Sequence, residues 1–558
     1  MLRRAWKPAL VVSVPALGYL YYTSREQSFE LPVRLRGPDG KATMSTRTIP
    51  LLSMAAVDAR IREKATANTV TRPGIVWHHT TASVNANDPI EDATANQVIR
   101  RDEGDGDLLF FAVMDGHGGF HTSQLLSRVL INAVVLELSS LNKPPASSAW
   151  FDSIKGAIWG VSNASVGNNK SGDNVDIHIS PDAQSPLSLP RKADATPLLV
   201  ARAIQTAFTS LDTELIAAPL RVLASALDAK DTTSKNVEIP DLSKHPLALP
   251  AMLPAMSGSC ALLAMFDTAH RDLYVACVGD SRAVAGIWEP EEGEEGKGSW
   301  RVEVLTEDQT GRNPAEVKRI QSEHPSSEAG DVIRNGRILG GLEPSRAFGD
   351  ARYKWSRALQ QTLARAFLVG NDLALRSPST SQTPPYVIAR PVVTHRVLNL
   401  PTNDGSLASK GKPALRFVVL ATDGLWDELS SEDVVRLVGG HLAGLSGTVK
   451  KTQLATLVPT TTGTDAVEGK VARRQRTPAE AEAEGAWAFV DENPSAHLIR
   501  NAFGGANTGV LRRLLSIPEP LARRHRDDVS VTVVWWEEGK GPEVASVSVG
   551  KEEVKAKL

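Results

Sequence analysis

The stretch from Phe110 to Gly119 reads F-F-A-V-M-D-G-H-G-G and decides how the rest of the chain can be interpreted. The apolar run that ends at Met114 is typical of a buried strand. Asp115 and His117 follow within a glycine-rich turn that allows a tight bend and a close backbone approach to a bound group. A strand followed by an ordinary polar turn is the alternative interpretation. The rest of the sequence is needed to decide between a functional site and an ordinary turn.

Composition leaves most soluble classes open but excludes some. The chain has 558 residues, enough for several domains or for one large domain with insertions. A net charge of −2 gives no reason to expect nucleic acid as a partner. Cys260 and Cys277, the two cysteines of the chain, cannot form a disulfide framework or a cysteine-rich zinc site. Both lie in apolar runs and are expected to be buried, reduced thiols.

The N-terminus differs from the body of the chain. Residues 1–7 are basic, residues 9–22 are mostly apolar, and no acidic residue occurs before Glu26. The apolar run is short for a membrane span, which needs about 20 residues. A secretory signal, a mitochondrial presequence and a short membrane anchor are the three interpretations. We favour mitochondrial targeting or a short membrane anchor over residues 1–30, with membrane contact through 9–22.

The remaining chain divides into ordered and loose segments. Residues 31–70 are polar and are predicted to be a linker, with a modest helical pattern near their end. A folded domain is expected over 71–536, followed by a charged, disordered tail at 537–558. Polar, proline-rich or low-complexity stretches predict loop insertions near 142–196, 226–256 and 444–485.

Aspartates recur at the ends of predicted strands. Asp115, Asp280 and Asp423 each follow an apolar run and lie beside glycine, whereas Asp527 comes just before a run of β-branched and aromatic residues. Carboxylates without cysteine, and with little histidine among them, suit hard divalent cations such as Mg²⁺ or Mn²⁺. Two such ions about 4 Å apart can activate water and polarise a phosphoryl group. Turn formation and helix capping are the structural alternatives for these aspartates.

Other phosphate chemistries lack their motifs in this sequence. The position six residues after each cysteine, where a cysteine-dependent phosphatase has arginine, holds Phe266 or Ala283. No G-x-x-x-x-G-K-[ST] phosphate loop and no G-x-S-x-G nucleophile elbow occurs. These absences favour direct attack by activated water over a covalent intermediate.

Seven motifs in order resemble the metal-dependent type-2C Ser/Thr protein phosphatases. They are P-I-E-D at 89–92, D-G-H-G-G at 115–119, S-G-S-C-A at 257–261, V-G-D-S-R at 278–282, S-R-A-F-G-D at 345–350, A-T-D-G-L-W-D at 421–427 and R-D-D-V-S-V-T-V-V at 526–534. The resemblance implies an α+β, four-layer αββα sandwich, in which two packed antiparallel sheets are flanked by helices and interrupted by long loops. It also implies a metal cleft at one end of the sandwich.

The resemblance implies a role for each matching residue. Asp115 would bridge two Mg²⁺ or Mn²⁺ ions, and Gly116 would offer its carbonyl oxygen. Glu91 matches a ligand of one ion and Asp423 and Asp527 match ligands of the other, while Asp280 matches a ligand of a weaker third ion. His117 matches the general acid that protonates the leaving Ser or Thr oxygen, a task that suits imidazole near neutral pH.

One departure points to a branch of the family. Many members have an arginine that binds substrate phosphate where this chain has Asn87. Together with R-A-F-G-D-x-x-x-K-W at 346–355, N-x-P-I-E-D at 87–92 is similar to the mitochondrial pyruvate dehydrogenase phosphatases. Asn87 can donate hydrogen bonds to phosphate but supplies no charge. The resemblance implies a mitochondrial phosphoprotein substrate, with pyruvate dehydrogenase E1 alpha as the candidate.

The sequence therefore predicts a mitochondrial enzyme that hydrolyses phosphoserine and phosphothreonine in proteins through a metal-bridging hydroxide. Its location in the matrix or the intermembrane space stays open. A catalytically weak phosphatase fold that binds phosphoproteins as a regulatory module is the first alternative. Hydrolysis of small phosphate esters is the second.

Overall fold

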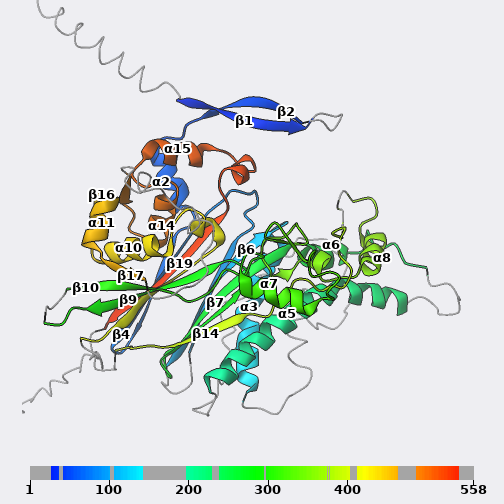
Figure 1. Cartoon of the computed structure of the whole chain (residues 1–558), viewed down its shortest axis with the longest axis horizontal. Helices are drawn as coiled ribbons and strands as arrows, with labels where there is room; N and C mark the ends of the chain where they lie inside the picture. The colour runs from blue at the N-terminus through cyan, green and yellow to red at the C-terminus, as the bar shows by residue number, and fades with distance from the viewer. Residues whose placement is uncertain are drawn as a thin grey trace, which may run out of the picture.

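The computed structural model describes most of the chain. The described residues are 27–36, 42–100, 106–141, 196–228, 238–293, 297–371, 373, 375, 377–401, 411–462 and 485–539. They form two sheets that pack face to face, with helices on both outer sides (Figure 1). The predicted α+β, four-layer αββα architecture is confirmed.

The first sheet has seven strands. All neighbouring pairs are antiparallel except the parallel pair of β10 and β17 at one edge. In spatial order the strands are β17 (Thr460–Thr462), β10 (Gly298–Val304), β9 (Arg282–Pro290), β15 (Ala414–Ala421), β19 (Val529–Glu538), β4 (Ile75–Val84) and β3 (Thr66–Arg72).

The second sheet has six strands, and its neighbouring pairs are all antiparallel. Its main path is β14 (Val392–Val397), β8 (Asp272–Val278), β7 (Gly258–Asp267), β6 (Asp107–His117) and β5 (Ala93–Arg100), and the short β13 (Phe348–Gly349) pairs with one end of β7. The central strands β6 and β7 are buried along almost their whole length, as expected for strands covered on both faces.

The facing sides of the two sheets form a continuous apolar core. Aromatic side chains from both sheets meet there: Trp77 of β4 lies 5.3 Å from Phe266 of β7 and 4.9 Å from Trp536 of β19, measured between ring centroids. Cys277 is buried in this core, and Cys260 is buried beside the cleft described below. Both are free thiols, as predicted. Because the sheets interlock over this area, their strand ends are held in fixed positions relative to one another.

Helices cover the outer face of each sheet. On the six-stranded sheet lie α3 (His121–Ser140) and α5 (Pro197–Asp228), and the far part of α5 packs with α6 (Ala248–Met256) and α8 (Arg357–Phe367). On the seven-stranded sheet lie α2 (Met54–Arg62), α9 (Asp423–Trp426), α10 (Ser431–Leu442), α11 (Lys451–Leu457), α14 (Pro494–Ala502) and α15 (Thr508–Ser516). Local sequence sets several helix starts. For example, Ser430 and Asp433 form a reciprocal capping box at the start of α10.

Short elements complete the described chain. They are α7 (Pro314–Glu323), the hairpin of β11 (Ile333–Arg334) and β12 (Arg337–Ile338), the 3₁₀ helices η2 (Ala351–Tyr353) and η3 (Leu521–Arg524), and the pair of β16 (Gly447–Lys450) and β18 (Ala486–Phe489).

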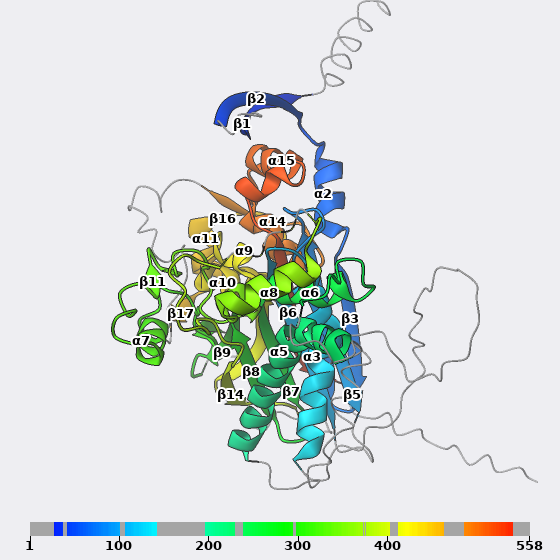
Figure 2. The same cartoon turned by 90° about the vertical axis from the view of Figure 1, so that its right-hand side faces the viewer.

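The prediction of a linker over 31–70 is wrong. β1 (Ser28–Arg36) and β2 (Ala42–Pro50) form an antiparallel hairpin beside α15 in both views (Figures 1 and 2), and α2 and β3 follow it. Among the hairpin residues whose burial is described, Leu31, Val33 and Ile49 are buried and apolar, and they pack with Ala86 and with residues near η3. Most other hairpin side chains are exposed, so the sequence contains no apolar run that would reveal the strands.

Two predicted insertions are smaller than expected. Residues 248–256 form α6, and residues 447–462 form β16, α11 and β17, because the apolar side chains of these stretches complete the helical layers. Within the same two predicted insertions, residues 229–237 and 463–484 lie outside the described residues. So do residues 1–26, 142–195 and 540–558, on which the predicted targeting segment, the first insertion and the tail fall.

Membrane contact through residues 9–22 likewise falls on residues outside the described part of the chain. Among the helices that are described, none combines the length and the apolar character that crossing a membrane requires.

Candidate active site

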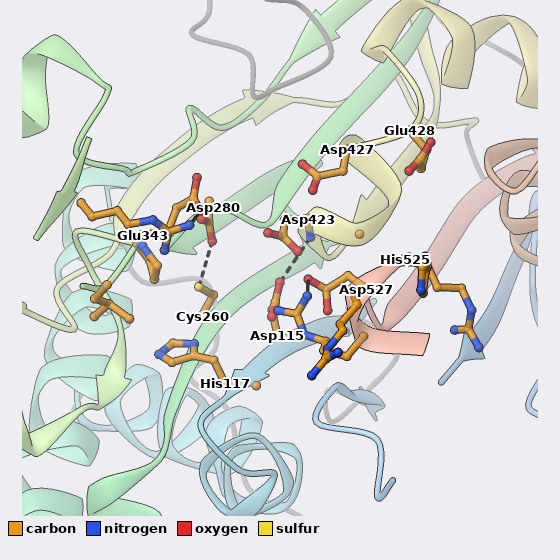
Figure 3. Close-up of a pocket in the computed structure, with 18 of the residues that line it drawn as sticks. Asp115, His117, Cys260, Asp280, Glu343, Asp423, Asp427, Glu428, His525 and Asp527 are labelled. Carbon is orange, nitrogen blue, oxygen red and sulfur yellow. Dashed lines mark hydrogen bonds and ion pairs between the residues drawn. The ribbon is translucent and has the colours of Figure 1, made fainter. Parts of the chain in front are cut away.

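The ends of five strands meet at one end of the sandwich. β15 and β19 are antiparallel neighbours, so the end of β15 lies beside the start of β19, and Ala421 pairs with Val531. The same end of β15 lies beside the start of β9, where Ala421 pairs with Arg282. This geometry brings Asp423 and Asp527 from one sheet toward Asp115, near the end of β6, and Asp280, which follows β8 (Figure 3).

A cleft of about 380 Å³ opens at this end. Six of the predicted site residues line it: Asp115, Gly116, His117, Asp280, Asp423 and Asp527. Carboxylate oxygens of Asp115, Asp280 and Asp423 all lie within 4.8 Å of one another, a spacing that a shared metal ion could span. The backbone N–H of Asp423 also donates to the Asp115 carboxylate over 3.3 Å, which helps to orient it.

The carboxylates raise one another's pKa. Burial, followed by the charges of Asp423 and other nearby carboxylates, raises the pKa of Asp115 well above its ordinary value. Burial and Asp423 raise the pKa of Asp280 to about 7. Burial raises the pKa of Asp527 to about 6, although the Arg523 guanidinium opposes this change. Carboxylates arranged in this way need cations to stay ionised together.

Gly116 and Glu91 lie against each other through their backbones. A Cβ atom on Gly116 would come within 2.1 Å of the Glu91 carbonyl oxygen, so only glycine fits there. The Glu91 side chain accepts a hydrogen bond from the Gly119 N–H over 2.7 Å, and Glu91 is not among the residues that line the cleft. The structure therefore gathers Asp115, Asp280 and Asp423 tightly and places Glu91 at one side. Its role as a metal ligand stays a prediction.

His117 has a buried partner that sequence reasoning missed. Its Nε2 lies 2.5 Å from Oδ2 of Asp350, whose side chain is 3% exposed. Burial alone would lower the pKa of His117, but the charge and the hydrogen bond of Asp350 raise it above its ordinary value. Asp350 has a left-handed backbone conformation (φ 49°), and a Cβ atom on Gly258 would collide with both side chains. The local fold thus reserves space for the His117–Asp350 contact.

Asn87 does not face the cleft. Its side-chain amide donates to Asp528 over 2.9 Å, and its backbone N–H donates to the same carboxylate over 3.0 Å. Asp528 also accepts hydrogen bonds from the N–H groups of Ala86 and Glu91, so it orders the whole turn. These contacts do not support the predicted binding of substrate phosphate by Asn87.

Further residues line the cleft that sequence reasoning did not include. Cys260 donates its thiol hydrogen to Asp280 over 3.1 Å (Figure 3). Asp427 ends α9 and lines the cleft, whereas Ser430 caps the following helix α10. Arg523 reaches the cleft from η3 and forms an ion pair with Asp527, with 2.7 Å between Nη1 and Oδ2.

The donor set fits hard divalent cations. It consists of carboxylate oxygens with mutually raised pKa values and of a glycine whose missing side chain leaves its backbone accessible in the cleft. Oxygen donors of this kind are those that Mg²⁺ and Mn²⁺ prefer.

Comparison with known proteins identifies the family. The family model described as protein phosphatase 2C matches residues 223–455. A protein phosphatase 2C homolog from Schizosaccharomyces pombe is 29% identical over 537 residues, which covers 95% of this chain and 95% of that protein. The mitochondrial [pyruvate dehydrogenase [acetyl-transferring]]-phosphatase 1 of Saccharomyces cerevisiae is 29% identical, and the aligned region covers 97% of this chain and 84% of that protein. The human mitochondrial phosphatase 2 of the same name is 33% identical over 482 residues, or 83% of this chain and 78% of that protein.

The chain belongs to the type-2C family of protein phosphatases and is a protein serine/threonine phosphatase. Within the family it falls in the branch that resembles the pyruvate dehydrogenase phosphatases. The resemblance predicted from the seven motifs is confirmed.

Proposed function

We propose that this phosphatase hydrolyses phosphoserine and phosphothreonine in proteins with the help of Mg²⁺ or Mn²⁺ held in the acidic cleft. The observation that carries the proposal is the convergence of Asp115, Asp280 and Asp423 within 4.8 Å. Together with Asp527, Glu91 and the carbonyl oxygen of Gly116, these residues would hold two ions and a weaker third one. Bound ions of this kind supply activated water at neutral pH and neutralise phosphate charge.

The chain's own residues complete the reaction. His117 lines the cleft, so it can reach the oxygen of the departing serine or threonine and give it a proton. Asp350 fixes the ring and favours its protonated form. Because Asp350 is itself held by the N–H···O bond to the Ser257 carbonyl, the histidine is kept in one position before the substrate binds.

The substrate that we propose is the phosphorylated E1 alpha subunit of the pyruvate dehydrogenase complex in mitochondria. Two similar proteins carry pyruvate dehydrogenase phosphatase and mitochondrial in their names, and both align over most of this chain. The basic and apolar N-terminal sequence supports the same location.

The test compares two substrates and two variants. Phosphate release is measured from the intact phosphorylated complex and from an unrelated phosphoserine peptide, with Mn²⁺ or with a chelator. We expect metal-dependent turnover, faster on the complex, and a loss of about 10² in turnover for His117→Gln. Asp241→Asn, which changes an exposed carboxylate outside the cleft, serves as the control.

Two results would contradict the proposal in different ways. Folded wild type that binds the phosphorylated complex without releasing phosphate would favour the regulatory binding module. Turnover of small phosphate esters without turnover of either phosphoprotein substrate would favour the metabolite phosphatase.

A further inference from the structure

Arg523 occupies a position that neither the sequence motifs nor the metal site explains. It lies in η3, a short 3₁₀ helix that directly precedes Asp527. Buried Ala522 anchors this helix against Leu31, Val33 and Ile49 of the N-terminal hairpin, and its N–H donates to the Pro518 carbonyl over 3.0 Å. The backbone that presents Arg523 to the cleft is therefore supported from behind.

Asp527 engages only part of the guanidinium of Arg523. One nitrogen, Nη1, forms the 2.7 Å ion pair with Asp527, while half of the side chain (50%) stays exposed, and the residue lines the cleft. A guanidinium has five N–H donors in a planar fork that matches two phosphate oxygens. Donors therefore remain for a ligand that enters the cleft.

Other cationic side chains of the cleft are placed less favourably. Arg337 donates to Glu343 over 2.5 Å, at the opposite wall. Arg526 is buried and donates to the Asn85 carbonyl. Arg524 is exposed and makes no hydrogen bond or ion pair with any described residue, so nothing fixes its direction. Arg523 is the arginine that an ion pair holds beside the acidic cluster.

The charges around Arg523 support this position. Burial would lower the pKa of its guanidinium, but the carboxylates of Asp527, Asp423 and Asp115 raise it. Arg523 also lines the same cleft as these three proposed metal ligands. A phosphate group that enters this cleft would therefore meet the guanidinium in the same space as the carboxylates that would hold the ions.

Asn87, the other candidate for binding the phosphate, is engaged elsewhere. The Asn87 amide is engaged by Asp528 and lies outside the cleft lining. A phosphate dianion in a partly buried cleft needs charge-assisted donors, since these hydrogen bonds are about twice as strong as neutral ones.

We propose that Arg523 binds the substrate phosphate directly, with its fork turned toward the cleft and one nitrogen kept on Asp527. This inference rests on the phosphatase function proposed above and adds to it the residue that recognises the phosphate. Asp527 then has two functions: it is a metal ligand, and it orients the arginine.

The experiment measures binding separately from turnover. A peptide with the phosphonate analogue of phosphoserine is titrated calorimetrically into Mn²⁺-saturated protein, and Mn²⁺ is titrated separately into metal-free protein. We expect Arg523→Gln to weaken phosphonate binding about tenfold and to raise KM for a phosphopeptide more than it lowers kcat. Arg523→Lys, which keeps the charge but loses the fork, should lose about threefold. The neighbouring Arg524→Gln removes the same charge and should change binding by less than about twofold.

The outcomes separate this inference from the proposed function. Equal losses for Arg523→Gln and Arg524→Gln would overturn it in favour of a general charge effect. So would unchanged phosphonate affinity in Arg523→Gln at saturating Mn²⁺, even if its Mn²⁺ affinity changes. If Arg523→Gln does not fold, the comparison of Arg523→Lys with wild type decides. Wild type without any turnover of phosphoproteins would instead refute the proposed function itself.

Discussion

The molecule contains two groups of largely buried acids whose pKa values shift in opposite directions. In the cleft, Asp115 lies among other carboxylates, and their repulsion raises its pKa well above the ordinary value. At the start of α7, Glu316 is also buried, but it accepts hydrogen bonds from Arg346 over 2.7 Å and from Arg319 over 2.8 Å. Burial alone would raise the pKa of Glu316, yet the two arginines lower it to about 2.

The difference distinguishes a structural acid from a functional one. Around Glu316 the chain supplies its own cations, and the network ties α7 to the segment that ends at Asp350. Around Asp115 the nearest charges are mostly negative, so the cluster is stable as anions only when cations come from solution. A buried carboxylate thus stabilises the fold in one place and costs stability for the sake of metal binding in the other.

The largest expected effect comes from Asp115→Asn. We expect turnover to fall at least about 10³-fold, because the substitution removes the charge at the centre of the cluster. Without metal, the variant should be as stable as wild type or more stable, since a repulsive charge disappears. Phosphate-release assays and thermal melts of metal-free protein check the two parts. A metal-free variant that melts well below wild type would show that Asp115 is structural.

The Glu316 network should respond in the opposite sense. Glu316→Gln leaves the buried Arg346 without its charged partner and should lower the free energy of unfolding by about 3 kcal/mol, measured in urea. Glu323→Gln is the matched control: it breaks an exposed ion pair of the same Arg319 and should cost less than about 0.5 kcal/mol. Equal costs for the two variants would remove the contrast between buried and exposed pairing.

Added metal should stabilise the cleft and leave the Glu316 network unaffected. At Mn²⁺ concentrations near 100 times its Kd, wild type and Glu316→Gln should both gain about 2.7 kcal/mol of unfolding free energy. Asp115→Asn should gain much less. Thermal melts with and without Mn²⁺ measure these gains, and an equal gain in Asp115→Asn would place the ions elsewhere.

The smallest expected effect is the change in stability at acidic pH. Because the folded-state pKa of Glu316 lies below its ordinary value of 4.5, its stabilisation is complete above about pH 5 and is lost as the pH falls toward about 2. The stability difference between wild type and Glu316→Gln should therefore shrink by about 1 kcal/mol between pH 7 and pH 4. Urea unfolding at both pH values measures this change. A difference that grows as the pH falls would contradict the assigned direction.

The sequence predicted those features of the fold and site that local patterns encode. The apolar run of β6 and the Asp-Gly turn after it identify a buried strand end without tertiary information, and the same holds for Asp280 and Asp423. Side-chain alternation could not reveal β1 and β2, because their exposed faces are polar and only a few apolar residues point inward.

Partners that are distant in sequence could not be predicted. Asp350 lies 233 residues from His117. The two come together because Gly258 of β7 pairs with His117 of β6 on one side and with Gly349 of β13 on the other. Asn87 had a plausible position for binding phosphate, but no local pattern indicates that Asp528, more than 400 residues later, engages its amide. Arg523 lies in a 3₁₀ helix too short to show periodicity, and this helix packs through Ala522 against the N-terminal hairpin, which is distant in sequence.

The most direct test of the central claim is a titration of Mn²⁺ into metal-free wild-type protein, with bound ions and phosphate release from a phosphoserine protein measured in the same samples. We predict that turnover is absent at first, rises as the cleft fills, and reaches its maximum once at least two ions are bound per chain. Turnover that is already full in metal-free protein, or that does not change as ions bind, would contradict the claim that these carboxylates are kept together to hold catalytic cations.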